Sequence, residues 1–148
     1  MSYVSNNLID GEEILQTTRL HWLLFLNPFL VFLGAVTSQL FLDTTMMNLI
    51  SQFLCAIVLI MLVQSLFYFY FTEIVVTNKR IIVKTGFFTI NTNEILFKKV
   101  ESIDLEQNII DRMFSRGNVK IKGTGDTHMN ISGILNPVSF KNKVLSLL

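Results

Sequence analysis

The chain has 148 residues, of which 51% are hydrophobic, and its formal net charge is +1. This length suits one small domain together with a membrane element, and a charge so close to zero gives no reason to expect a nucleic-acid partner. The single cysteine, Cys55, excludes an intrachain disulfide and a cysteine metal cluster.

The first segment, residues 1–19, is polar and carries Asp10, Glu12 and Glu13 but only one base, Arg19. Because it has no basic n-region, a cleavable signal peptide is not expected. The segment is predicted to lie in the cytoplasm. After the turn signal Gly11-Glu12-Glu13 it forms either a short first strand or an acidic tail.

Residues 20–71 hold two long apolar runs, 20–42 and 46–71, with one Asp and no Glu, Lys or Arg. As helices these runs would extend about 34 and 39 Å. A bilayer core is about 30 Å thick, so each run is long enough to span it with some tilt. The spacer of residues 43–45 is too short to hold a domain, and the sequence therefore predicts a transmembrane helical hairpin.

Aromatic and basic residues orient this hairpin. Trp22 at one end and Tyr68 and Tyr70 at the other are predicted to form an aromatic belt at the same membrane face. Eleven Lys and Arg residues follow Phe71, against seven Asp and Glu, whereas the spacer carries no Lys or Arg. The positive-inside rule then predicts that both termini are cytoplasmic and that the spacer is outside.

Beyond residue 71 the pattern changes to short segments of period two, which predicts a cytoplasmic domain over residues 72–148. One-sided alternation predicts an antiparallel sheet with one buried and one wet face. Helical spacing predicts a short helix over residues 108–114 and a closing helix after Asn136-Pro137, with Phe140, Val144 and Leu147 on its apolar face. The predicted strands cover residues 73–77, 80–84, 89–97, 100–106, 118–122 and 129–132. Together the elements form an α+β, mainly-β domain, a bent sheet or partial barrel plugged by a helix.

Several motifs, in this order and spacing, resemble the bacterial pleckstrin-homology-like (PH-like) domain of small membrane proteins, often called membrane-flanked domains. The early Gly11-Glu12-Glu13-Ile14-Leu15 also fits that pattern. The motifs are Thr77-Asn78-Lys79-Arg80-Ile81-Ile82-Val83, Gly86, Glu94-Ile95, Val100-Glu101-Ser102-Ile103, Gly117-Asn118-Val119-Lys120-Ile121, Gly123-Thr124-Gly125 and Ile134-Leu135-Asn136-Pro137.

The resemblance implies a seven-stranded PH-like antiparallel half-barrel capped by a C-terminal helix. It also implies that residues 12–18 act as a strand that joins the sheet from the other side of the hairpin. It implies no enzymatic activity, and it implies a multi-pass protein of the bacterial cytoplasmic (inner) membrane.

No catalytic or metal-binding constellation is visible, so no cofactor or metal is expected and the chain is not expected to be an enzyme. Neither His21 nor His128 has partners at a spacing typical of zinc sites or catalytic triads. Asp104 and Glu106 share a strand face, where solvated ion pairs are the expected explanation. The nearby cations expected to pair with them are Lys98, Lys99 and Arg112.

The candidate lipid or interface contacts lie in two turns. Lys79 and Arg80 match the loop that binds phosphoinositides in eukaryotic PH domains, but an upright strand from Phe71 would place Lys79 about 20 Å from the bilayer, beyond a Debye length of about 8 Å. Lys84 with Phe87 and Phe88 lies at the next turn, which returns toward the bilayer. The two phenylalanines are either core residues or residues that hold the domain on the lipid surface.

These observations favour a non-catalytic membrane-anchored module that binds a protein partner or assembles with copies of itself at the cytoplasmic membrane face. Two alternatives remain open. One is a module that binds anionic membrane lipids, and the other is an accessory subunit of a transport or export system. A hairpin without intramembrane charge is a poor ion pathway by itself.

Overall fold

The computed structural model describes residues 4–41, 45–87, 89–125 and 127–148. The chain divides into two compact units. The sheet unit combines Met1–His21 with Phe71–Leu148, and the helical unit is the segment between them, Trp22–Tyr70. One unit is thus built from both ends of the chain.

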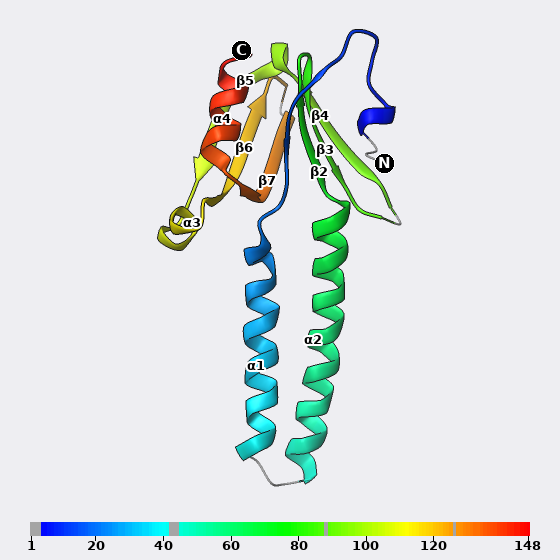
Figure 1. Ribbon diagram of the computed structural model, residues 1–148, viewed down its shortest axis with the longest axis vertical. Coiled ribbons are helices and arrows are strands. Elements are labelled where there is room, and N and C mark those ends of the chain that lie inside the picture. Colours follow the sequence, from blue (N-terminus) through cyan, green and yellow to red (C-terminus); the bar gives the residue numbers. More distant parts are fainter. Residues whose placement is uncertain (1–3, 42–44, 88, 126) are drawn as a thin grey trace. The chain divides into compact units, whose positions relative to one another are not determined.

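The helical unit consists of a 3-10 turn, η2 (Trp22–Phe25), and two helices, α1 (Leu26–Phe41) and α2 (Thr45–Phe71). The two helices run antiparallel (Figure 1), and the rings of Phe25 and Phe69 lie 5.5 Å apart. Among the described residues one helix, Leu49–Phe71, is long and apolar enough to cross a membrane. The apolar helix Trp22–Ser38 is shorter.

In the described parts of the sheet unit, seven antiparallel strands form two sheets. The four-stranded sheet has the order β1-β2-β3-β4 and the three-stranded sheet the order β5-β6-β7. The bounds are β1 Ile14–Thr18, β2 Glu73–Thr77, β3 Arg80–Thr85, β4 Asn91–Leu96, β5 Val100–Glu106, β6 Arg116–Gly123 and β7 Thr127–Leu135. A 3-10 turn, η3 (Phe97–Lys99), joins β4 to β5. This is the predicted seven-stranded PH-like arrangement.

Strand β1 reaches its partner across the whole helical unit in sequence. It pairs antiparallel with β2, with Thr18 opposite Ile74, which confirms the strand expected from the resemblance. The chain then continues along β7, where Leu20 bridges Ile134 and the His21 N–H donates to the Gly133 carbonyl at 2.8 Å. These residues join the two sheets at a corner.

The C-terminal helix α4 (Pro137–Leu145) begins, as predicted, after Asn136 with Pro137 in its first turn. It packs on β5, β6 and β1 (Figure 1). The predicted stripe is confirmed for Phe140 and Val144, which are fully buried, while Leu147 is half-buried. The core residues that pack inside the sheets include Ile74, Val76, Ile81, Val119, Ile121, Met129, Ile131 and Ile134.

Strands β2 and β3 are buried on both faces, and the prediction of one wet face is wrong for them. The reason is the N-terminal segment, residues 4–13, which begins with the 3-10 turn η1 (Val4–Asn6). Val4, 1% exposed, packs with Val75 and Ile82 on the face of the sheet away from the main core, and Leu8 packs beside them. We call residues 4–13 the strap, because they cover a face that would otherwise be apolar and open.

The predicted short helix is confirmed as α3 (Ile109–Met113). Asn108 caps it, and the Asn108 and Asp111 side chains form a reciprocal capping box with the backbone. Although its sequence has an apolar face at helical spacing, none of its residues is buried.

Candidate functional site

The polar centre of the strap is an ion pair between Glu12 and Arg80. The Arg80 guanidinium donates from Nε to Glu12 Oε1 and from Nη2 to Oε2, both at 2.9 Å. The same carboxylate accepts the Thr77 hydroxyl at 2.8 Å and the Ile9 N–H at 2.9 Å. The Glu12 side chain is 0% exposed and that of Arg80 is 11% exposed. A two-pronged arginine–carboxylate pair of this kind fixes both position and orientation.

The surroundings of Glu12 act on its pKa in opposite directions. Burial raises the pKa, but the hydrogen bonds from Arg80, Ile9 and Thr77 and the charge of Arg80 lower it by more in total, so the pKa lies below its ordinary value. The bond to Glu12 also raises the pKa of Arg80. Both groups are therefore held in their charged forms.

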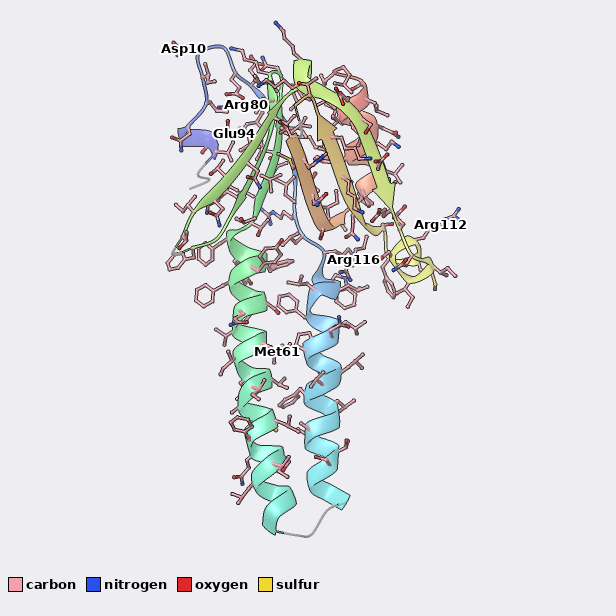
Figure 2. All side chains as sticks on the ribbon, turned by 180° about the vertical axis from the view of Figure 1, so that it is seen from behind. Asp10, Met61, Arg80, Glu94, Arg112 and Arg116 are labelled. Carbon is pink, nitrogen blue, oxygen red and sulfur yellow. The ribbon has the colours of Figure 1, made fainter. Side chains whose placement is uncertain are left out.

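The predicted lipid contacts Lys79 and Arg80 are both engaged with neighbouring chain segments. Lys79 Nζ donates to the Asp10 carbonyl at 2.7 Å, and Arg80 Nη1 lies 2.6 Å from Glu94 Oε2. Figure 2 shows Arg80 and Glu94 beside the segment that carries Asp10. Arg80 is largely buried by its two carboxylate partners, and the bond of Lys79 ties this turn to the strap, so the geometry favours a structural role for the turn.

The second predicted contact, around Lys84, is largely inward. Lys84 is 7% exposed, and its Nζ lies 5.9 Å from the centroid of the Phe71 ring. The Phe87 ring packs on Phe71 with centroids 4.3 Å apart, yet Phe87 is 50% exposed. Phe88 lies outside the described residues. Among the described residues of this group, Phe87 presents the large apolar surface.

The three residues of the predicted aromatic belt are all exposed on the helical unit. The exposed fractions are 57% for Trp22, 40% for Tyr68 and 72% for Tyr70. Exposure of aromatic rings at the ends of apolar helices is compatible with a belt, and the belt stays a prediction.

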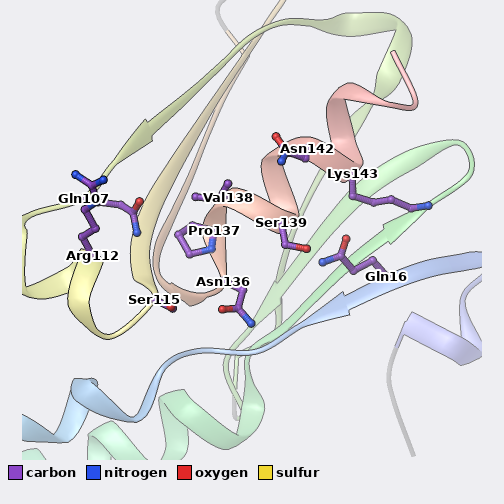
Figure 3. A pocket seen from close by; sticks show the side chains of 10 residues that line it. All are labelled: Gln16, Gln107, Arg112, Ser115, Asn136, Pro137, Val138, Ser139, Asn142 and Lys143. Atoms are coloured by element: carbon purple, nitrogen blue, oxygen red, sulfur yellow. The ribbon is translucent and has the colours of Figure 1, made fainter.

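An open cleft of about 770 Å³ lies where α4 begins. Figure 3 shows its side chains around the first turn of α4, with Gln107 and Arg112 on one wall and Gln16 of β1 on another. The lining residues are Gln16, Gln107, Arg112, Ser115, Asn136, Pro137, Val138, Ser139, Asn142 and Lys143. The sequence gives no sign of this cleft, because its residues come from three separate segments and carry no motif.

The walls of the cleft are fixed by backbone contacts. Gln107 Nε2 donates to the Arg116 carbonyl at 2.6 Å, and the Asn136 N–H donates to the Ser115 carbonyl at 2.8 Å. Gly117 lies behind them, and a Cβ atom there would fall 2.8 Å from Cγ of both Gln107 and Pro137. Only glycine lets these two walls approach so closely.

The cleft has a distinct chemistry. Its lining holds amides, hydroxyls and the two cations Arg112 and Lys143, and no carboxylate is among the lining residues. A second hollow of about 380 Å³ continues it along β1 and shares Gln16, Asn136 and Ser139 with it. Such a surface suits a ligand with hydrogen-bonding groups and negative charge.

The remaining polar candidates have ordinary surroundings. No group of three or more His, Cys, Asp or Glu residues in the described parts of the chain could hold a metal ion. Glu106 pairs with Lys120 at 2.6 Å and Asp104 with Lys122 at 3.3 Å, on the exposed face shared by β5 and β6. These carboxylates are paired across strands, and not with the expected Lys98, Lys99 and Arg112.

Comparison with a solved structure gives the fold. The crystal structure of a DUF1696 family protein with a pleckstrin-homology domain from Shewanella loihica PV-4 aligns with a TM-score of 0.50 and 11% identity. The alignment covers 97% of this chain and 88% of the other. No match to this chain is found among curated proteins.

Comparison with protein families shows the family to which this chain belongs. The sequence profile described as "Bacterial PH domain" matches residues 28–145, most of the chain. The order of strands, the closing helix α4 and this match agree. The chain belongs to the bacterial PH domain family.

Proposed function

We propose that the chain is a non-catalytic, membrane-anchored PH-like module that binds an acidic peptide segment of a protein partner in the cleft between β1, α3 and α4. The single observation that carries the proposal is the lining of this cleft, in which Arg112 and Lys143 face amides and hydroxyls without a carboxylate. Amides hydrogen-bond a peptide backbone, and the two cations attract acidic side chains or a C-terminal carboxylate.

The position of β1 supports an extended ligand. In the four-stranded sheet β1 is an edge strand, and Gln16 from this strand lines the cleft. Edge strands offer backbone hydrogen bonds to a further strand. A peptide lying along β1 would pass the first turn of α4.

Strand pairing supports a double membrane crossing. Because β1 and β2 are hydrogen-bonded neighbours, the segment between them must cross a membrane an even number of times. The helix Leu49–Phe71 is long enough for one crossing. Residues 22–41 offer the other, since η2 and α1 together extend about 32 Å. The excess of basic residues after Phe71 then favours the cytoplasm for both ends.

A labelling experiment tests this topology. Single cysteines at Ser5 and Leu148, in a Cys55→Ser background, should resist a membrane-impermeant maleimide in intact cells and react after permeabilisation. Reaction of either cysteine in intact cells would refute the double crossing with cytoplasmic ends.

Site-specific photocrosslinking tests the cleft. A photoreactive amino acid at Ser139 in the full chain should give a protein adduct in native membranes, and the same residue at Lys98, exposed and away from the cleft, should not. The charge reversals Arg112→Glu and Lys143→Glu should reduce the adduct, while the matched reversal Lys122→Glu on β6 should not.

Three outcomes would count against the proposal. Equal adducts at Ser139 and Lys98 would show no preference for the cleft. An adduct that extracts into organic solvent would identify a lipid, and an adduct of twice the chain mass would identify a second copy of the chain in place of another protein.

A further inference from the structure

The helix α3 and the residue after it present four large apolar side chains to solvent. The exposed fractions are 84% for Ile109, 58% for Ile110, 77% for Met113 and 45% for Phe114. Ile109 and Met113 are four residues apart, as are Ile110 and Phe114, and residues at this spacing are neighbours on a helix surface. Clustered exposure of this kind marks a contact surface, whereas single exposed apolar residues do not.

The charged side chains of α3 do not oppose contact with an anionic surface. Its carboxylate, Asp111, is turned inward, with a side chain 16% exposed that caps the helix start and lies 3.6 Å from Arg116. Arg112 is exposed and lines the cleft. The helix therefore carries no unpaired acid that would oppose contact with an anionic membrane surface.

The sheet unit places this surface beside one of its two chain exits. The His21 side chain hydrogen-bonds to the backbone of Phe114, and His21 is the last residue of the sheet unit before the helical unit begins. At the other exit the half-exposed Phe87 packs on Phe71. Exposed apolar side chains therefore lie at both points where the chain leaves the sheet unit for the apolar helices.

We propose that α3 inserts its apolar face into the cytoplasmic leaflet of the membrane, while Arg112 remains in the wall of the cleft. Apolar side chains of an amphipathic helix at a bilayer lie about 5–10 Å into the headgroup and acyl boundary. The inference rests on the membrane anchoring proposed above, and it adds a specific contact that holds the sheet unit against the bilayer.

The shape of α3 favours lipid over a protein as the occupant. The helix has five residues and projects beyond the ends of β5 and β6 (Figure 1). A stable protein interface buries about 800 Å² on each partner over a broad surface, which a single projecting turn does not offer. Lipid, by contrast, moulds itself around a convex group of side chains.

Depth-dependent fluorescence quenching in liposomes tests the proposal on the full chain. In a Cys55→Ser background, Met113→Cys carries an environment-sensitive fluorophore, and nitroxide-labelled lipid acts as quencher in bilayers with anionic lipid. The matched control is Thr124→Cys, directly after the last residue of β6 and about 26 Å along the strand from its first residue, Arg116. We expect quenching at Met113→Cys to exceed that at Thr124→Cys by about twofold or more.

A second pair of variants shows whether the apolar face causes the insertion. Ile109→Asp with Ile110→Asp should abolish the excess quenching at Met113→Cys, and Leu145→Asp on α4, an exposed apolar residue of similar kind, should leave it unchanged. All of these side chains are exposed, so the variants should fold.

The outcomes separate this inference from membrane anchoring. A chain retained in the bilayer after alkaline carbonate, but with Met113→Cys as open to aqueous iodide as Thr124→Cys, would overturn the α3 proposal alone. Disulfide crosslinking of Met113→Cys between copies would overturn it in favour of a protein contact. Extraction by carbonate would overturn the anchoring and the α3 insertion together.

Discussion

The buried pair of Glu12 and Arg80 gives a quantitative prediction for the strap. Removal of one partner of a buried ion pair leaves an uncompensated charge and costs about 3–5 kcal/mol. Arg80→Met falls in this range because it leaves the fully buried Glu12 carboxylate without its arginine. Glu12→Gln should cost less, about 2–3 kcal/mol, since Arg80 keeps the partly exposed Glu94 and an amide still accepts a hydrogen bond.

A double-mutant cycle isolates the pair itself. With Glu12→Gln, Arg80→Met and the double variant, we expect a coupling energy of about 2 kcal/mol, within the range of residues in one hydrogen-bonded network. The half-exposed pair of Lys122 and Asp104, at 3.3 Å, is the matched control. An exposed pair of this kind contributes less than about 1 kcal/mol.

Pulse proteolysis in urea on the detergent-solubilised full chain measures the free energy of unfolding, and hydrogen exchange of peptides from residues 4–13 measures release of the strap. Both should respond to the single variants. A coupling energy no larger than that of the control pair, or exchange in residues 4–13 that does not rise in Arg80→Met, would refute the view that this pair holds the strap on the sheet.

Three further predictions follow from the sheet unit. Because the pKa of Glu12 is lowered on folding, its contribution to stability is present above the ordinary carboxyl pKa of about 4.5 and is lost as the pH falls toward the folded value; urea midpoints should drop on acidification less steeply in Glu12→Gln. Gly86→Ala should destabilise the fold by more than about 2 kcal/mol, because φ is +90° and a Cβ would fall 2.0 Å from the Thr89 carbonyl oxygen. The control Gly125→Ala, at φ +71° with nothing within 4 Å of a Cβ, should cost about 1 kcal/mol. Equal urea midpoints for the two variants would contradict the contact at Gly86. Thr18→Val should be neutral or stabilising, because the buried Thr18 hydroxyl has no hydrogen-bond partner among the described residues. Thr77→Val should cost about 1–3 kcal/mol, because it loses the hydrogen bond to Glu12. A lower urea midpoint for Thr18→Val than for Thr77→Val would refute this reasoning.

Local patterns in the sequence were sufficient to predict most elements of the sheet unit. The β-branched runs on both sides of Asn78-Lys79 predict the hairpin of β2 and β3, and Asn136-Pro137 predicts the start of α4. These signals are local, since turn chemistry and side-chain periodicity act within a few residues. The motif order then identified the PH-like fold that the family match confirms.

Features that depend on distant segments were missed. The alternation along β2 gives no sign that its second face is covered, because Val4 and Leu8 lie about 70 residues earlier in the sequence. Lys79 and Arg80 looked available for a ligand in the sequence. Their partners Asp10 and Glu12 belong to the same distant strap, so the sequence around the turn does not show that the two cations are engaged. The predicted partners of Asp104 and Glu106 were wrong for a related reason. Which residues pair across strands depends on the strand register, and composition does not reveal the register.

The cleft at the start of α4 marks the limit of sequence reasoning here. Gln16, Gln107 and Ser139 are unremarkable where they stand in the sequence, and only the packing of α4 on β1 and β5 brings them together. The one local hint was Gly117, whose lack of a side chain is required behind the wall of the cleft.

The pairing of β1 with β2 also determines when the fold can be completed. Every other strand pairs with a neighbour in sequence, whereas the contact between Glu13 and Asn78 spans 65 positions. At about 5–20 residues per second, a ribosome makes β1 roughly 3 to 13 s before its partner exists. During that interval β1 and the strap stay unpaired, so a nascent chain that stalls before residue 73 displays an open strand to chaperones and proteases.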